Sequence, residues 1–131
     1  MGLKDLCERM HRVYRDDNVP KAQKDMFATL PEMAERPAET YDKLVHGRVE
    51  SIEIDKLMGH TLAVMLVPYP PGIPVIMPGE RLTAATKSIH DYLLYAREFD
   101  QKFPGFETDI HGLRFEPTPN GGRRYLVDCV A

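Results

Sequence analysis

The stretch from Glu107 to His111, Glu-Thr-Asp-Ile-His, is the densest local group of side chains that could bind a metal ion. If the stretch is extended, Glu107, Asp109 and His111 point the same way, because alternate residues of a strand share a face. Two carboxylates and an imidazole could then bind a divalent cation. They fit a polar loop edge equally well, and no two histidines have the spacing of a helical zinc motif. We therefore predict no metal site.

Residues for nucleophilic catalysis and phosphate binding lack the neighbours that such chemistry needs. Ser51 and Ser88 do not lie in a Gly-x-Ser-x-Gly turn, and neither cysteine has a histidine in any specific arrangement nearby. Gly121 and Gly122 belong to an expected turn, and no other glycine-rich loop could bind a phosphate group. The chain itself is expected to contain no catalytic residue.

The segment from Pro68 to Glu80, PYPPGIPVIMPGE, holds five prolines and two glycines in thirteen residues. Proline fixes its own φ, and the residue before each proline favours extended backbone. A central strand could not hold so many prolines, and a surface linker would be polar. We therefore expect a rigid segment whose apolar residues are buried against another surface; they are Ile73, Val75, Ile76 and Met77.

Two other interpretations of this segment concern its prolines and its last residue. Pro70, Pro71 and Pro74 could be displayed as a polyproline ligand, although the apolar neighbours favour burial. Glu80 could form a salt bridge with Arg81 or cap the following helix, or it could line a polar cavity.

The elements that must position these residues follow from the apolar periodicity. It predicts one-sided helices over residues 3–15, 20–30 and 37–46, and a longer helix from Thr83 to Phe103. It predicts strands near residues 48–54, 61–67, 75–77, 112–116 and 123–130, with the run at 61–67 buried on both faces. The fold class is therefore α+β, with N-terminal helices, a small mixed sheet with a proline-rich segment, one long helix and a C-terminal β-hairpin.

The totals indicate one domain of 131 residues with a formal net charge of −3. That charge argues against nucleic acid or an anionic membrane as the partner. No apolar run is long enough to span a membrane, and no secretion leader is visible. Cys7 and Cys129 are expected to be reduced thiols, as in a cytoplasmic protein.

Two motifs carry a family resemblance. The run from Pro68 to Pro74 followed by Pro78-Gly79-Glu80, and the later run from Phe103 to Gly112, resemble the C-terminal domain of the bacterial ornithine/lysine/arginine decarboxylases. The resemblance covers essentially the whole chain. The wording Phe-Glu-Thr-Asp-Ile-His-Gly is more similar to the lysine decarboxylases than to the arginine or ornithine enzymes, which stay open as alternatives.

This resemblance implies a parent enzyme that binds pyridoxal phosphate through a lysine and removes the carboxylate of a basic amino acid as CO₂. The seven lysines of this chain follow Leu, Pro, Gln, Asp, Asp, Thr and Gln, so the His-Lys cofactor motif is missing. We therefore expect residues 1–131 to be the C-terminal domain alone, inactive by itself and without bound cofactor.

In the family, this domain packs on the cofactor-bearing domains beside the active-site cleft of a dimer or larger assembly, and helps to shape the entrance. The resemblance makes ten residues candidates for the interface or the entrance: Pro68, Tyr69, Pro70, Pro71, Gly72, Pro78, Gly79, Glu80, Glu107 and Asp109. The acidic ones would favour a cationic substrate. The alternative is a stand-alone interaction or regulatory module with the same fold.

Overall fold

A computed structural model describes residues 2–69 and 72–131, and its element order confirms the α+β class. In chain order the helices and strands are α1 (Leu3–Asp16), α2 (Val19–Ala28), β1 (Glu32–Met33), α3 (Pro37–Val45), β2 (Val49–Glu53), β3 (Val67–Tyr69), β4 (Glu80–Arg81), α4 (Lys87–Lys102), β5 (Asp109–His111), β6 (Arg114–Pro117) and β7 (Arg123–Val130). Short 3-10 turns precede β3 and α4, at Ile54–Lys56 and Ala84–Thr86.

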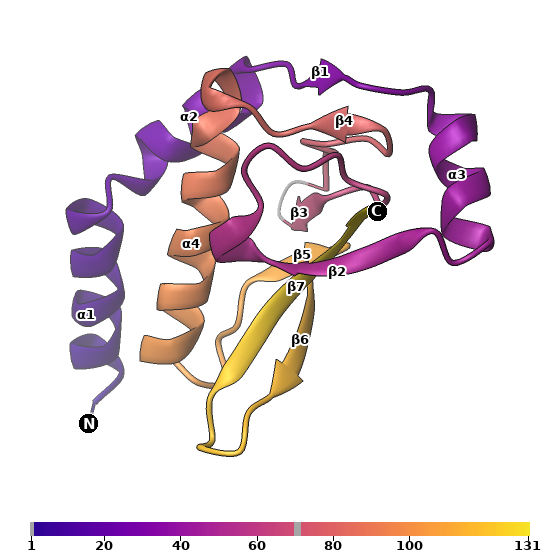
Figure 1. Cartoon of the computed structure of the whole chain (residues 1–131). Coiled ribbons are helices and arrows are strands. Elements are labelled where there is room, and N and C mark those ends of the chain that lie inside the picture. Colours follow the sequence, from indigo (N-terminus) through magenta and orange to yellow (C-terminus); the bar gives the residue numbers. More distant parts are fainter. Residues whose placement is uncertain (1, 70–71) are drawn as a thin grey trace.

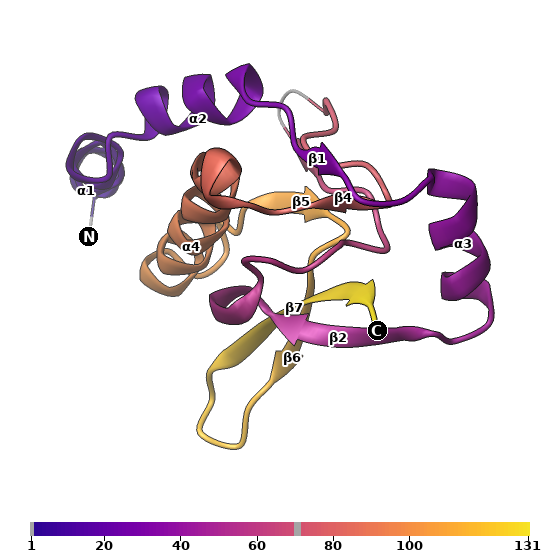
Figure 2. The same ribbon diagram turned by 45° about the horizontal axis from the view of Figure 1, so that its top comes forward.

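Helix α4 lies between the N-terminal helices and the strands, and α3 lies beyond the strands (Figures 1 and 2). The predicted long helix is confirmed, and the face that periodicity assigned to the core is buried from Ile89 to Phe99. Towards its C-terminal end the same stripe packs on α1 through a small separate cluster of Val13, Phe99 and Phe103. Among the described residues, no helix is both long and apolar enough to cross a lipid bilayer.

The strands form three small antiparallel sheets, where the sequence predicted one small mixed sheet. The largest has the order β2-β7-β6, and the predicted C-terminal hairpin is its β6–β7 pair. The other two sheets are the pairs β1–β4 and β3–β5. Each pair joins short segments from distant parts of the chain, which hydrophobic periodicity cannot match to one another.

The prediction of a central strand buried on both faces over residues 61–67 was wrong in geometry and only partly right in burial, because Met65 is 41% exposed. Leu62, Ala63 and Leu66 are buried, but their N–H groups donate to two different parts of the chain: to Glu80 and Ile76 of the proline-rich segment and to Asp128 of β7. Only the last residue of the run belongs to a strand, β3. A continuous apolar run indicates that most of a segment is buried. It does not indicate which backbone groups form hydrogen bonds with that segment.

Candidate functional site

The β3–β5 pair brings together the two motifs singled out in the sequence. Tyr69 lies directly opposite Asp109, forty residues further along the chain, and Pro68 lies opposite Ile110. The Tyr69 ring is tilted against the His111 imidazole, with centroids 4.6 Å apart. The Asp109 carboxylate lies 3.4 Å from His111 Nε2, and both side chains are exposed. An aromatic ring, an imidazole and a carboxylate therefore share one exposed surface.

Gly72 folds the chain back over this surface. Its N–H donates to the Pro68 carbonyl at 2.8 Å, and its φ of +82° lies in the region that favours glycine. A Cβ at this position would lie 2.7 Å from the Tyr69 ring. The turn therefore requires glycine to keep the ring in place. Pro70 and Pro71, also candidates, lie outside the described residues.

Pro78 and Gly79 lie at the other end of the proline-rich segment, where Gly79 forms hydrogen bonds with the body of the domain. The Gly79 N–H donates to Leu62, and the Gly79 carbonyl accepts the N–H groups of Ala34 and Glu35. A Cβ on Gly79 would lie 2.3 Å from the Glu35 carbonyl oxygen, and its φ is +91°. The contact is therefore backbone against backbone, which makes this end of the segment rigid.

Between these ends, the segment is less buried than the sequence predicted. Ile76 is fully buried; the Leu66 N–H donates to the Ile76 carbonyl, and the Leu66 carbonyl accepts the N–H of Val75. Ile73 and Met77, however, are 54% and 42% exposed. Because neighbouring residues of an extended chain point to opposite sides, burying Ile76 turns Met77 outward. The expectation of burial was wrong for these two residues.

Two further apolar side chains are exposed on β1 and just before it. The sequence patterns did not indicate them as candidates. Met33 pairs with Glu80 and is 57% exposed, and Leu30, just before β1, is 90% exposed. Leu30 had been assigned to the buried face of the second helix, but α2 ends at Ala28. The signal that could have found it is Pro31, which leaves Leu30 in the connection rather than on the helix face.

Glu80 caps its own turn. Its carboxylate accepts the N–H of Met77, and its backbone N–H donates to the Met77 carbonyl. Neither alternative role, a salt bridge to Arg81 or a cap of the following helix, is present among the described residues, because Arg81 donates to Thr61 and Thr86 caps the turn at Thr83. The partly exposed carboxylate is therefore fixed in direction beside β1.

Glu107 has different hydrogen-bond and ion-pair partners from the other two acidic candidates, Asp109 and Glu80. It accepts the N–H of Gly105 at 3.0 Å and lies 3.6 Å from the Arg123 guanidinium. The Gly105 hydrogen bond, with the nearby arginine, lowers the pKa of Glu107. Within the described residues, no three His, Cys, Asp or Glu side chains are placed to hold a metal ion. Of the three residues predicted to share a face, Asp109 and His111 therefore lie together, and Glu107 makes other contacts.

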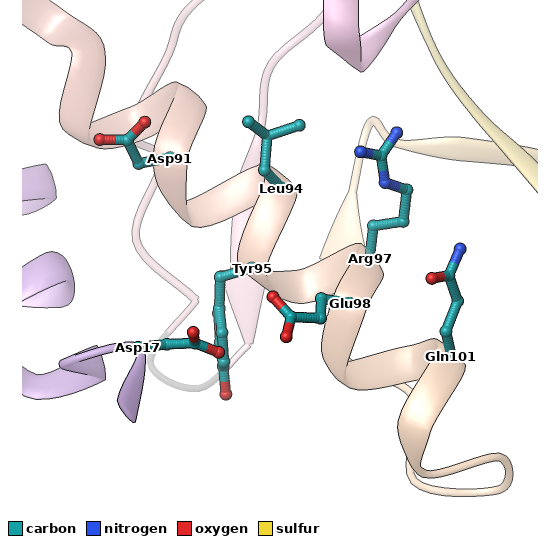
Figure 3. Close-up of a pocket in the computed structure, with 7 residues that line it drawn as sticks. All are labelled: Asp17, Asp91, Leu94, Tyr95, Arg97, Glu98 and Gln101. Atoms are coloured by element: carbon teal, nitrogen blue, oxygen red, sulfur yellow. The ribbon is translucent and has the colours of Figure 1, made fainter. Parts of the chain in front are cut away.

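A second candidate location is a hollow of about 450 Å³ against the outer face of α4. Figure 3 shows Asp17 and Glu98 directed toward the Tyr95 ring, while Arg97 and Gln101 point away from it. One oxygen of Asp17 is buried without a hydrogen-bond partner among the described residues. Burial, with the nearby Glu98, raises the pKa of the Asp17 carboxyl. Glu98 is paired with Lys102 at 2.7 Å, so the negative charge where Asp17 meets α4 is that of the Asp17 carboxylate itself.

Comparison with known proteins gives one consistent family. Residues 20–131 match the family model described as Orn/Lys/Arg decarboxylase, C-terminal domain. Lysine decarboxylase LdcA of Pseudomonas aeruginosa is 57% identical over 130 residues, which are 99% of this chain and 17% of that protein. The constitutive lysine decarboxylase of Escherichia coli is 40% identical over 114 residues, covering 87% of this chain and 16% of that protein. Bacterial ornithine and arginine decarboxylases match with lower identity.

Solved structures give the same result for the fold. The structure of lysine decarboxylase A from Pseudomonas aeruginosa superimposes with a TM-score of 0.90 at 57% identity. The superposition covers 99% of this chain and 17% of that one. The chain thus spans about a sixth of the length of the relatives that it matches.

Proposed function

The chain belongs to the Orn/Lys/Arg decarboxylase family as its C-terminal domain, and from this we propose that it serves a larger enzyme that decarboxylates L-lysine to cadaverine. The choice of lysine is supported by the identity to lysine decarboxylases, which exceeds that to the ornithine and arginine enzymes. The sequence motif around Asp109 favours the same substrate.

The family implies pyridoxal phosphate, and the residues of this chain do not fit that cofactor. A Schiff-base lysine is activated by desolvation or by a cationic neighbour. Six of the seven lysines here are exposed, and the seventh, Lys43, pairs with Glu35 at 2.6 Å. The cofactor and the bond-breaking chemistry therefore belong to other domains of the proposed enzyme, and no step of the reaction is assigned to this chain.

The role that we infer for this domain is to pack on the cofactor-bearing domains through a docking surface, defined as Leu30, Met33, Ile73 and Met77. Two of these exposed apolar side chains lie on or just before β1 and two lie on the proline-rich segment, and exposed apolar residues of this size can mark an interaction site. The backbone of Met33 is held by its pairing with Glu80, and the Met77 carbonyl accepts the N–H of Glu80. A surface that is ordered before binding loses less entropy on association. The proposal rests on the exposure of these four apolar side chains.

The docking surface can be tested by charge substitution in the full-length protein. Met33→Glu and Ile73→Glu each place a charge in the proposed contact, so we expect a lower melting temperature of the assembled enzyme and a loss of cofactor-dependent activity. Val45→Glu is the matched control, because Val45 is also exposed but lies on α3. If all three variants behave alike, the docking surface is wrong.

The acidic residues beside this surface are proposed to attract the cationic substrate to the entrance. Asp109 and Glu80 are partly or fully exposed, and no arginine or lysine is paired with them among the described residues. Glu107 contributes less, because Arg123 offsets its charge. A cleft lined by one sign of charge raises the local concentration of an oppositely charged substrate.

The entrance role predicts a separation of kinetic parameters in the full-length enzyme. Glu80→Gln and Asp109→Asn should each raise KM for lysine, by about two- to fivefold at low salt, while kcat and the cofactor absorption spectrum stay unchanged. Glu50→Gln on β2 is the control, because Glu50 is also an exposed carboxylate and no arginine or lysine is paired with it among the described residues. A KM that is the same in all three variants would remove this role.

The length of the natural gene product separates the decarboxylase from a stand-alone module of the same fold. A coding region with several hundred residues before this domain supports the enzyme, and a gene that encodes this domain alone contradicts it. We place the protein in the cytoplasm and expect a homodimer or larger assembly. The two free cysteines support a reducing compartment.

A further inference from the structure

A second pocket, of about 350 Å³, lies between α1, α2, α4 and the β3–β5 pair. Five aromatic rings line it: Tyr14, Tyr69, Tyr92, Tyr95 and Phe99. Its volume is within the range of pockets that hold small molecules. The proposed docking function does not use this pocket, although Tyr69 stands at the edge of both.

The rings form a floor and a rim. Phe99 and Tyr92 are almost fully buried, while Tyr14 and Tyr69 are partly exposed. Tyr14 stacks on Phe99 with centroids 5.6 Å apart and only 7° between their planes. Tyr95 is tilted against both floor rings, at 5.7 Å from Tyr92 and 6.0 Å from Phe99. A molecule in the pocket would therefore meet aromatic faces and edges on several sides.

Two carboxylates, those of Asp17 and Asp100, lie near these rings, while the Glu98 carboxylate is paired with Lys102. Tyr95 also lines the hollow of Figure 3, where the buried oxygen of Asp17 has no hydrogen-bond partner among the described residues. Burial raises the pKa of Tyr95, and the negative charges of Asp17 and Asp100 raise it further. None of the described residues that line the pocket is positively charged, and the nearby Lys21 and Lys24 on α2 are exposed.

We propose that this pocket binds an organic ammonium cation, with its charged group against the tyrosine rings and its apolar substituents over the floor. The face of an aromatic ring carries negative charge density, so it attracts a cation, and the attraction grows where water is excluded. Asp17 and Asp100 add a longer-range attraction without occupying the pocket. Gln23 and Thr108 at the lining supply polar groups that can accept a hydrogen bond from the ligand.

The charge of the preferred ligand distinguishes the proposed cation site from a purely apolar pocket. An apolar pocket would take a neutral molecule of the same shape equally well, whereas an aromatic and acidic surface discriminates by charge. Choline and 3,3-dimethylbutan-1-ol have nearly the same shape and differ in charge. They are therefore suitable probes for the pocket.

The experiment is ligand-observed saturation-transfer NMR on the full-length protein with each of the two probes. We expect choline to bind about tenfold more tightly than the neutral alcohol, as a cation on several desolvated rings would. Tyr95→Leu and Tyr69→Leu should each weaken choline binding several-fold, and Asp17→Asn should weaken it by a smaller factor. Phe115→Leu is the control, because Phe115 is a half-exposed aromatic residue on β6, away from the pocket lining.

Two results would overturn the proposal. One is equal binding of choline and the alcohol, which shows that charge plays no part. The other is choline binding that survives both tyrosine substitutions, which places the cation elsewhere in the protein. Tyr69 is exposed, so Tyr69→Leu keeps the test valid even if the more buried Tyr95→Leu variant does not fold. Because the readout is binding, it is independent of substrate turnover and of domain docking.

Discussion

The Tyr125 hydroxyl donates a hydrogen bond to the Asp100 carboxylate at 3.0 Å, inside the domain and 25 residues away along the chain. The other carboxylate oxygen accepts the N–H and the hydroxyl of Thr108, at 2.7 and 3.1 Å. Asp100 is only 6% exposed, so these donors replace the water that it would bind in the unfolded chain. One buried carboxylate thereby joins α4, the connection to β5, and β7.

We predict that Tyr125→Phe lowers the free energy of unfolding by about 1–3 kcal/mol, because it leaves one oxygen of Asp100 without a donor in a buried site. Urea unfolding measures this. Tyr41→Phe, on α3, is the control for the loss of a tyrosine hydroxyl, since Tyr41 is exposed. A Tyr125→Phe variant as stable as the wild type would show that Asp100 finds another donor.

Alkaline pH should unfold the domain through groups that are buried in their protonated form. Burial raises the pKa of Tyr125 to about 12 and that of Cys129 to about 12. Both groups lose their protons more readily in the unfolded chain, so unfolding is favoured as pH rises from the ordinary pKa toward the raised one. The contribution of these two groups to stability should be constant up to about pH 8 and fall from about pH 9 upward, where an ordinary thiol ionises.

A cysteine substitution isolates one of these contributions. Cys129→Val keeps an apolar side chain in the core and removes the thiol, so the decline that begins near pH 9 should become shallower. Cys7→Ser is the control, because Cys7 is exposed. Urea unfolding at one-unit pH intervals measures the slope, and equal slopes in Cys129→Val and Cys7→Ser would contradict the prediction.

Gly79→Ala should destabilise the domain strongly. The new Cβ would lie 2.3 Å from the Glu35 carbonyl oxygen, so the backbone of one segment has to move, and the positive φ adds strain. Gly59→Ala is the matched control, because Gly59 has a φ of +83° and, apart from its chain neighbours, none of the described residues has an atom within 4 Å of the new Cβ. We expect a loss of about 1 kcal/mol for Gly59→Ala and at least about 3 kcal/mol for Gly79→Ala. Equal losses would mean that the contact with Glu35 yields easily.

Local sequence signals predicted the helices and the hairpin well, because each of these elements forms between neighbours in the chain. The apolar stripe from Ile89 to Phe99 is buried as periodicity indicated, and strand β7 begins and ends where alternation placed it. The family resemblance, which rests on the wording of the two motifs, was confirmed by the family match. These are the features that short sequence windows carry.

The non-local contacts could not be predicted in the same way. Nothing in the sequence indicates that Tyr69 pairs with Asp109, or that the Gly79 carbonyl accepts N–H groups from Ala34 and Glu35. The aromatic pocket has the same origin, since its rings come from α1, β3 and α4. Each ring had a simpler interpretation as part of a helix or strand face, and only the packing of these elements brings the rings together.

The unpaired oxygen of Asp17 leads to the last prediction, that Asp17→Asn stabilises the domain at neutral pH. Burial raises the pKa of this carboxyl, so the charged form is disfavoured in the folded protein relative to the unfolded chain. The folded protein therefore retains this proton to higher pH, and its stability falls as pH rises through the raised pKa.

An amide has no charge to desolvate. Asp17→Asn should raise the melting temperature at pH 7 by about 2–4 °C and lose this advantage at pH 3, where the carboxyl is protonated in both states. Asp16→Asn is the control at the same helix end, because Asp16 is exposed. An equal gain in Asp16→Asn would attribute the effect to the general negative charge at the end of α1 instead of to the buried oxygen.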